Sequence, residues 1–302
     1  MTSHPGVPAP APAPRAPTRI GPAMFDWGRR TFVMGIVNMT PDSFSGDGLL
    51  MAGGDRVAAA VELGRRMAAE GADLLDIGGE STRPGHAAVA EDEELARVVP
   101  VIAALRADLP AMPLSVDTTK PQVAAAALDA GADLLNDVWG VGSDDGLARL
   151  AAARGVPLVV MHNRAEPRYG DLIADVVADL KAALDRAERL GVAADHLIVD
   201  PGFGFGKTPE QNLALVRELG ALRALGRPIL LGTSRKSTLG RVLGLPVEER
   251  LEATLATTAL GIAAGADIVR VHDVRANVRA ARISDAIVRA NWRPAAAQGG
   301  PS

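Results

Sequence analysis

Short apolar runs without polar alternation recur along the chain, and longer amphipathic stretches separate them. Three phrases nearly repeat, and in each a helix-like stretch ends at a glycine before an apolar run begins: EGADLLDIGG at 70–79, AGADLLNDVW at 130–139 and AGADIVRVHD at 264–273. Glycine is the usual residue just past the end of a helix. The same pattern predicts eight strands, at 32–37, 74–78, 112–117, 133–137, 157–161, 196–200, 228–232 and 267–271.

Strands that are apolar throughout are typical of a parallel sheet that is covered on both faces. Eight of them, separated by helices, predict a single α/β domain folded as a (β/α)8 TIM barrel, which typically needs ~250 residues. A doubly wound open sheet is the alternative, but the glycine fingerprint that usually follows its first strand is missing. We expect the barrel to span 24–293, between a disordered Pro/Ala-rich tail at 1–23 and a second disordered tail at 294–302.

Composition narrows the classes of function. The 302 residues carry a net charge of −4, which argues against general nucleic-acid binding. No segment is apolar enough or long enough to span a bilayer, so no membrane partner is expected. The chain has no cysteine, which excludes disulfides and thiolate nucleophiles and is compatible with a cytoplasmic protein.

Polar residues stand at the end of nearly every predicted strand, where TIM barrels place their active sites. One such residue alone is often a cap or a rim salt bridge, but their convergence predicts a single polar ligand. Arginine suits phosphate, whereas a buried carboxylate beside a carboxamide complements a ring with an amino group and an N–H. We therefore expect a ligand with an anionic part and a flat heterocyclic part. The strand-end residues are Asn38, Asp76, Asp117, Asn136, His162, Asp200, Ser234, Arg235, Lys236, Arg270 and His272.

Two loop segments invite a more specific interpretation. DPGFGFGKT at 200–208 ends like a phosphate loop, but its glycines fit neither the Walker A pattern nor the dinucleotide fingerprint. In NMTPDSF, Asn38 and Asp42 offer oxygen atoms suited to Mg2+ beside a phosphate, although Thr-Pro-Asp also predicts an ordinary turn. Neither segment defines a function by itself.

Seven motifs together resemble the dihydropteroate synthase family over residues 31–288: GIVNMTPDSFS at 35–45, DIGGESTRPG at 76–85, SVDTTKP at 115–121, LLND at 134–137, DPGFGFGKT at 200–208, GTSRKS at 232–237 and RVHD at 270–273. The resemblance implies a transferase of folate biosynthesis, which condenses (7,8-dihydropterin-6-yl)methyl diphosphate with 4-aminobenzoate. It further implies a homodimer that uses Mg2+ and is inhibited by sulfonamides. In this chemistry the diphosphate leaves first, and the arylamine then attacks without a strong general base.

The resemblance also implies a role for each matching residue. The residues expected to bind the pterin are Asp117, Asn136, Met161, Asp200, Gly232 and Lys236. Those expected to hold the diphosphate are Asn38, Thr82, Arg83, Arg270 and His272, with Asn38 also a ligand of Mg2+. Those expected to border 4-aminobenzoate are Pro84, Phe205, Arg235 and Ser237. The implied catalytic residues are Asp42, Asp47, Thr82, Arg83 and Lys236.

Two motifs depart from the family pattern. SFSGDG has an additional Gly46 compared with the more frequent SFSDGG, and the acidic residue is thereby shifted to Asp47. MHNR at 161–164 replaces MHM and leaves Asn163 and Arg164 without an implied role. Two alternatives remain open: a pterin-dependent methyltransferase that feeds corrinoid proteins, and a paralogue that keeps the barrel but has lost the reaction.

Overall fold

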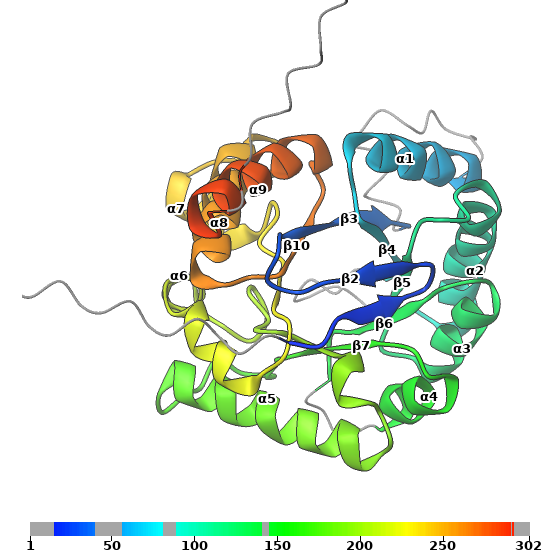
Figure 1. Ribbon diagram of the computed structural model, residues 1–302, viewed down its shortest axis with the longest axis horizontal. Helices are drawn as coiled ribbons and strands as arrows, with labels where there is room; N and C mark the ends of the chain where they lie inside the picture. Colours follow the sequence, from blue (N-terminus) through cyan, green and yellow to red (C-terminus); the bar gives the residue numbers. More distant parts are fainter. Residues whose placement is uncertain (1–14, 40–55, 81–88, 141–144, 291, 293–302) are drawn as a thin grey trace, which may run out of the picture.

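Strands and helices alternate along the chain and form one barrel (Figure 1). The computed structural model describes residues 15–39, 56–80, 89–140, 145–290 and 292. The strands of the barrel are β3 (Phe32–Asn38), β4 (Leu74–Gly78), β5 (Leu114–Asp117), β6 (Leu134–Asp137), β7 (Leu158–Met161), β8 (Leu197–Asp200), β9 (Leu230–Leu231) and β10 (Ile268–Val271). The helices around them are α1 (Arg56–Glu70), α2 (Glu91–Asp108), α3 (Pro121–Asp129), α4 (Gly146–Arg154), α5 (Leu172–Arg189), α6 (Pro209–Arg217), α7 (Ser237–Leu243), α8 (Leu251–Ala264) and α9 (Val274–Val288). Within the described residues, short 3-10 helices lie at Ala194–His196, Leu219–Leu225 and Val247–Glu249.

The sheet is parallel and closes on itself. Its strand order is β8-β7-β6-β5-β4-β3-β10-β9, and a bridge between Val199 and Ile229 joins the two outer strands. The Val199 N–H donates to the Pro228 carbonyl at 2.9 Å across this seam. The predicted (β/α)8 barrel is therefore confirmed, and each predicted strand is present. The least complete is β9, which covers only Leu230–Leu231 of the predicted 228–232.

Successive side chains of each strand point alternately out of the barrel and into it. The outward residues, such as Val33, Leu75 and Val269, form one continuous core with the helices. The inward residues of the lower barrel, such as Leu134 and Ile198, form a second apolar cluster. Both faces of each strand are thus buried, which explains why the strands are apolar without alternation.

The helix ends follow from local sequence. The glycines of the three near-repeats, Gly71, Gly131 and Gly265, adopt φ values of 101°, 113° and 110°, a region that favours glycine. Helix α6 begins with a capping box between Thr208 and Gln211, directly after the DPGFGFGK segment. Among the helices within the described residues, none combines the length and the apolar character needed to cross a membrane.

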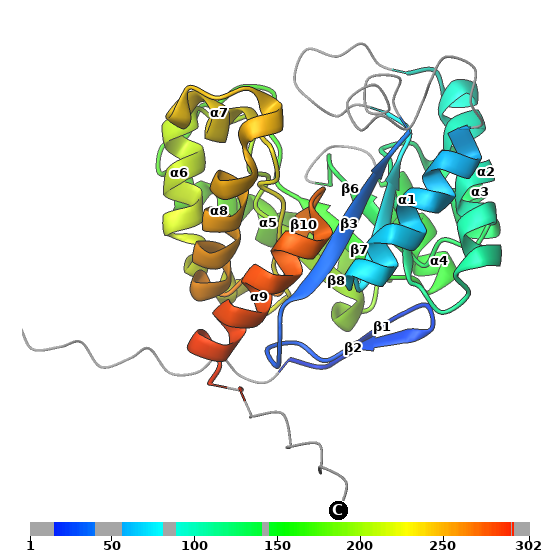
Figure 2. The ribbon, with the colours of Figure 1, turned by 90° about the horizontal axis from the view of Figure 1, so that it is seen from above.

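A short hairpin covers the end of the barrel at which the strands begin (Figure 2). Strands β1 (Thr18–Ile20) and β2 (Ala23–Phe25) pair antiparallel. The ring centroids of Phe25 and Phe32 lie 4.5 Å apart, and Trp27 packs edge-on against Phe32 at 5.4 Å. The predicted tail boundary at residue 23 is therefore corrected, because Ile20 is fully buried in the lower apolar cluster. Residues 1–14 and the predicted tail at 294–302 lie outside the described residues.

Phe25→Ala should lower the free energy of unfolding by about 3–5 kcal/mol, because it removes a fully buried aromatic side chain from the barrel plug. Met24→Ala is the matched control: Met24 is the preceding residue of the same strand and is 53% exposed. Met24→Ala should lower the free energy of unfolding by no more than roughly 0.5 kcal/mol, as is usual for a surface position. Urea unfolding followed by circular dichroism measures both, and equal losses would show that the hairpin does not seal the barrel.

Candidate active site

The inward positions near the strand ends carry polar side chains, directly above the apolar cluster of the lower barrel. Asp76 and Asp117 occupy inward positions of β4 and β5, and Asn136 and Asp200 come from β6 and β8. All four are buried, with Asp76 completely so. Within about two residues along these strands, the barrel interior thus changes from the apolar cluster to these four polar side chains, which we call the floor.

Arg270, on β10, is the centre of a buried network on this floor. Its Nε donates to Asp76 Oδ2 at 2.5 Å, and its Nη2 donates to Asp117 Oδ2 at 2.7 Å. The Asn136 Nδ2 also donates to Asp76 Oδ2, at 3.0 Å. One guanidinium therefore holds two carboxylates that would otherwise repel each other in a buried place.

Three oxygen atoms of the floor are buried without a hydrogen-bond partner within the described part of the chain: Asp76 Oδ1, Asp117 Oδ1 and Ser115 Oγ. A buried polar atom without a partner is costly, and native proteins keep few of them. Burial raises the pKa of Asp117 to about 7, although the charge of Arg270 opposes this shift. The floor is therefore suited to a ligand that brings N–H donors.

Lys236 lies at the side of the floor, next to the loop that follows β8. Its Nζ donates to the Phe203 carbonyl and lies 4.5 Å from the centroid of the Phe205 ring. Burial lowers the pKa of Lys236 to about 8, and the nearby Asp200 carboxylate opposes the shift. Burial likewise raises the pKa of Asp200, which accepts a hydrogen bond from the Gly202 N–H at 2.7 Å. A flat ligand on the floor would meet a cation and an aromatic face here.

Asn38 ends β3 at the same level as Gly78 of β4 and Asp117 of β5. A Cβ on Gly78 would stand 3.7 Å from Asn38 Oδ1 and from Asp117 Oδ2, and the latter oxygen accepts from Arg270, so the glycine leaves space beside the Asn38 oxygen. Mg2+ commonly takes one or two protein oxygens together with water and phosphate oxygens. The side-chain oxygen of Asn38 has the chemistry of one such protein ligand.

Ser234 and His272 meet at the end of β10. The His272 N–H donates to Ser234 Oγ at 3.1 Å, and His272 Nδ1 lies 3.0 Å from the same oxygen. This contact fixes the imidazole at the rim of the barrel, just after the end of the strand that carries Arg270.

The structure also shows where the other predicted residues lie. Met161 is buried opposite Asp200, and a Cβ on Gly232 would stand 3.7 Å from the Arg270 side chain. Arg235 has a positive φ of 55° and directs its guanidinium to Asp273, with contacts of 3.0 and 2.6 Å. The exposed first residue of α7 is Ser237. The predicted residues Asp42, Asp47, Thr82, Arg83 and Pro84 lie outside the described residues.

Two contributors to the floor were not assigned a role from the sequence, although Asp76 was noted as a strand-end residue. Asp76 holds both Arg270 and Asn136, and Ser115 adds a third buried oxygen atom. The available signal was a polar residue at an inward position within an otherwise apolar strand. Such a residue must find its partner inside the barrel.

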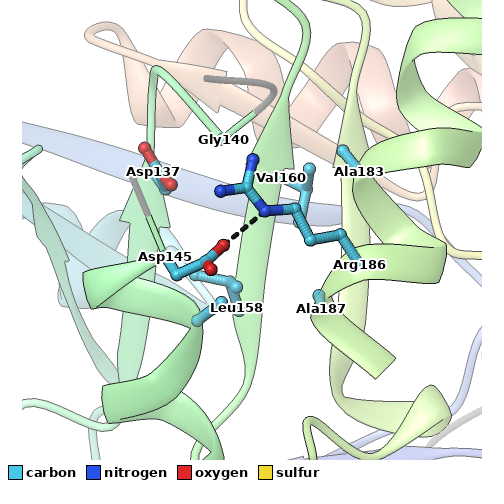
Figure 3. Close-up of a pocket in the computed structure, with 9 residues that line it drawn as sticks. Asp137, Gly140, Asp145, Leu158, Val160, Ala183, Arg186 and Ala187 are labelled. Atoms are coloured by element: carbon cyan, nitrogen blue, oxygen red, sulfur yellow. Dashed lines mark ion pairs between the residues drawn. The ribbon is translucent and has the colours of Figure 1, made fainter. Parts of the chain in front are cut away.

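A crevice outside the barrel, between α4 and α5, is the region shown in Figure 3. An ion pair between Asp145 and Arg186 crosses it, and Asp137 and Val160 form part of its wall. Its volume of about 20 Å³ is close to the space that one water molecule needs. It is too small for a substrate. The candidate active site is the barrel mouth, because the buried polar strand ends converge there.

Comparison with known proteins agrees with this geometry. The chain matches the pterin binding enzyme family over residues 34–272. It is 50% identical over 272 residues to a dihydropteroate synthase of Clostridium beijerinckii, which covers 90% of this chain and 99% of the relative. It is 48% identical over 267 residues to the Bacillus subtilis dihydropteroate synthase, with 88% and 92% covered.

Solved structures show the same likeness. A Clostridium difficile dihydropteroate synthase, determined in the presence of pteroic acid, has a TM-score of 0.83 and 47% identity, with 88% of this chain and 100% of that chain covered. A Xanthomonas albilineans dihydropteroate synthase in complex with 7,8-dihydropteroate has a TM-score of 0.78 and 45% identity, with 85% and 94% covered. A Yersinia pestis dihydropteroate synthase with a sulfonamide drug has a TM-score of 0.83 and 39% identity, with 90% and 99% covered.

Arg270→Met should lower the free energy of unfolding by about 3–5 kcal/mol near neutral pH, because it leaves two buried carboxylates without their cation. The loss should shrink in acid. A buried carboxyl with a raised pKa keeps its proton in the folded state, so its penalty is present only above its ordinary pKa. Urea unfolding at about pH 8 and about pH 5.5 measures the difference.

Arg65→Met is the control for this variant. Arg65 forms an ion pair with Asp108 on the surface, where its side chain is 54% exposed. Surface pairs contribute little, so its loss should be much smaller than that of Arg270→Met and nearly independent of pH. Comparable losses for the two variants would show that the network is not buried in solution.

Proposed function

Because this chain belongs to the dihydropteroate synthase family of pterin-binding enzymes, we propose that the barrel mouth is the active site of that reaction. The protein is a transferase of folate biosynthesis. It joins (7,8-dihydropterin-6-yl)methyl diphosphate to 4-aminobenzoate and releases 7,8-dihydropteroate and diphosphate. The observation that carries the assignment of the site is the polar floor, whose buried oxygens are presented to a donor-bearing ring.

The pterin ring is assigned to the floor. Its 2-amino group and N3–H are donors, and they complement the carboxylates of Asp200 and Asp117. Asn136, held by Asp76, adds a carboxamide of fixed orientation. Lys236 is placed to donate to the oxygen and nitrogen atoms on the opposite edge of the ring, and Met161 and Gly232 border the ring. The floor therefore selects a heterocycle with donors on one edge and acceptors on another.

The diphosphate is assigned to the rim above Arg270. Asn38, Arg270 and His272 supply polar groups there, and Thr82 and Arg83 remain predicted contributors. Asn38 is the proposed protein ligand of Mg2+, supported by the space that Gly78 leaves beside its Oδ1. When bound, Mg2+ supplies positive charge to the leaving diphosphate. Arg270 lies between the two halves of the substrate, because it also holds Asp117.

The 4-aminobenzoate is assigned to the side of the floor where Phe205 and Lys236 meet. Ser237, at the start of α7, borders this side. The guanidinium of Arg235 binds Asp273, so it is not directed to the ligand. Arg235 contributes through the shape of the turn instead. Pro84 keeps its predicted place at this side. Sulfonamides resemble 4-aminobenzoate in shape and charge, and we expect them to bind here, as one does to the Yersinia pestis protein.

The proposed reaction is dissociative. The bond between the pterin methylene carbon and the diphosphate oxygen breaks first, and the bonding electrons leave with the diphosphate. The amine of 4-aminobenzoate then forms the new C–N bond with the pterin cation and releases a proton. The cation must be shielded from water until then, which is the role proposed for the residues of 40–54 and 80–90. Within the first of these segments, Asp42 is a proposed oxygen donor beside Mg2+ and Asp47 a proposed stabiliser of the cation. No strong general base is required, because the attacking amine is neutral.

The comparisons favour this synthase over the two alternatives that the motifs left open. The relatives at 48–50% identity are named dihydropteroate synthases, and this chain covers nearly their whole length. A corrinoid-linked methyltransferase has no need of the GTSRKS segment or of an arginine-rich diphosphate site. An inactive paralogue would have lost the reaction through the altered SFSGDG segment, because Asn38, Arg270 and His272 are all present. We further propose a cytoplasmic location, with which the lack of cysteine is compatible.

We also propose a homodimer. Helices α8 and α9 pack side by side on the outside of the barrel (Figure 1). They carry large apolar side chains that are mostly exposed: Leu260 at 61%, Ile283 at 61% and Ile287 at 74%. Exposed apolar residues gathered on neighbouring helices are typical of a protein interface. A second copy of this chain is the proposed partner.

The proposed reaction is tested with purified protein, Mg2+, (7,8-dihydropterin-6-yl)methyl diphosphate and radiolabelled 4-aminobenzoate. Labelled 7,8-dihydropteroate should form, and chelation of Mg2+ should slow its formation.

Asp200→Asn should weaken binding of 6-hydroxymethyl-7,8-dihydropterin by about 1–3 kcal/mol, because one buried acceptor is replaced by a mispaired donor. The control is Asp195→Asn, which lies on the surface before β8. A folded wild-type protein that forms no product would refute the function, and unchanged affinity would remove Asp200 from the pocket.

The dimer is tested by light scattering of the eluting protein. Wild-type protein should elute at twice the monomer mass, and Ile283→Glu should shift it toward monomer because the new carboxylate would be buried at the interface. Met24→Glu, also at an exposed apolar position but on the barrel plug, should leave the mass unchanged. A monomeric wild-type protein would contradict the proposal.

A further inference from the structure

The loop 201–207 lies directly against the chain segment 162–164, which follows β7. Gly202 has a φ of 70°, and a Cβ there would stand 1.8 Å from the His162 carbonyl oxygen. Gly206 has a φ of 52°, and a Cβ there would stand 2.1 Å from the Arg164 carbonyl oxygen. Glycine at these two positions therefore allows the loop to rest on the neighbouring backbone.

Lys207 ties this loop together from the inside. Burial lowers the pKa of Lys207 to about 7, and the nearby Asp200 carboxylate opposes the shift. The charged ammonium form has three N–H donors and no acceptor, and each donor has one partner. Its Nζ lies 3.1 Å from the Gly202 carbonyl, 3.0 Å from the Phe205 carbonyl and 2.9 Å from His162 Nδ1. Two contacts hold the loop to itself, and the third joins it to the end of β7.

His162 connects Lys207 to helix α5. It is fully buried, and its Nε2 lies 3.1 Å from Asp179 Oδ2. Burial, together with the nearby Lys207 charge, lowers the pKa of His162 to about 4, so the ring is neutral. Since Nδ1 accepts from the ammonium, the proton is on Nε2 and is donated to Asp179. The two nitrogen atoms of the ring therefore have fixed and opposite roles.

Arg164 fixes Asp179 in turn. Its Nε and Nη2 lie 2.9 and 2.7 Å from Asp179 Oδ2, and its Nη1 donates to the Arg168 carbonyl at 2.7 Å. Its guanidinium also lies 4.6 Å from the centroid of the Tyr169 ring, and the Tyr169 hydroxyl donates to the Gly206 carbonyl at 2.8 Å. Arg164 and Tyr169 thus provide a second set of contacts between the segment after β7 and the same loop.

The loop carries two groups toward the barrel mouth. One is the Phe203 carbonyl, which accepts from Lys236 Nζ, and the other is the Phe205 ring, 4.5 Å from the same nitrogen. The pterin floor, in contrast, belongs mainly to strands, and this loop touches it where the Gly202 N–H donates to Asp200 and where the Phe203 carbonyl accepts from Lys236.

We propose that Lys207 is a positioning residue for the binding of 4-aminobenzoate. Its ammonium group, held through His162 to Asp179, fixes the loop so that the Phe205 ring stays beside Lys236. The inference rests on the proposed function for the identity of the bound molecule, but the hydrogen-bond chain itself is independent of it. It gives Arg164 a role as the residue that orients Asp179.

Lys207→Met tests the proposal, because methionine keeps the length of the side chain and removes its three donors. We expect the KM for 4-aminobenzoate to rise by about tenfold or more, as for the loss of hydrogen bonds to a charged group. The Kd of 6-hydroxymethyl-7,8-dihydropterin should change by less than about threefold. Amide hydrogen exchange of residues 202–206, measured without substrate, should become faster. Lys181→Met removes a lysine from a surface ion pair with Asp185 on α5 and should change none of these quantities.

Asp179→Asn is the second variant. It leaves Lys207 in place and weakens the contact of His162 with Asp179, at the end of the hydrogen-bond series that starts at Lys207. It should change the same quantities in the same direction and by less, and it decides the question if Lys207→Met does not fold. Wild-type protein that forms no product would refute the proposed function, whereas the exchange measurement would still test the loop. Unchanged exchange and an unchanged KM in an active protein would overturn the inference. Equal losses for pterin and 4-aminobenzoate would also overturn it.

Discussion

A partly buried arginine between two buried carboxylates is the interaction on which the barrel mouth depends. Asp76 and Asp117 stand on neighbouring parallel strands, and without Arg270 their charges would make the upper barrel unstable. The cation of Arg270 offsets this repulsion through single contacts, one to each carboxylate, and leaves the second oxygen of each unpartnered within the described structure. The same pairing that stabilises the folded barrel therefore also presents acceptors to a ligand. Stability and recognition are two effects of one guanidinium.

The position of this network follows from strand geometry, and that is why much of it was predictable. Each apolar run ends in a polar residue, and parallel strands of a barrel bring these ends together. The sequence alone thus placed Asp117, Asn136 and Asp200 correctly at one rim. It did not reveal the partner of each side chain, because contacts such as Asp76 with Arg270 join residues 194 positions apart. The hairpin was missed for a related reason: Ile20 and Phe25 are buried only because the lower barrel is there to receive them.

Other features could not be read from residue types. Arg235 has the chemistry of an anion ligand, but a positive φ and the nearby Asp273 turn it away from that use. Lys207 follows a glycine-rich loop as a phosphate-binding lysine would, yet its ammonium group binds carbonyls and a histidine. In both cases the decisive fact is which group lies within hydrogen-bond distance after folding. The roles assigned to residues of 40–55 and 81–88, such as Asp47 and Arg83, stay predictions, since these residues lie outside the described structure.

In the proposed complex, buried carboxylates on the barrel floor accept hydrogen bonds from the donor edge of the pterin. Calorimetric titration of the wild-type protein with 6-hydroxymethyl-7,8-dihydropterin and with its analogue lacking the 2-amino group tests these contacts. The analogue should bind roughly 10- to 100-fold more weakly, because a buried acceptor is left without its donor. Equal affinity for the two compounds would show that the carboxylates of Asp117 and Asp200 do not contact that edge of the ring.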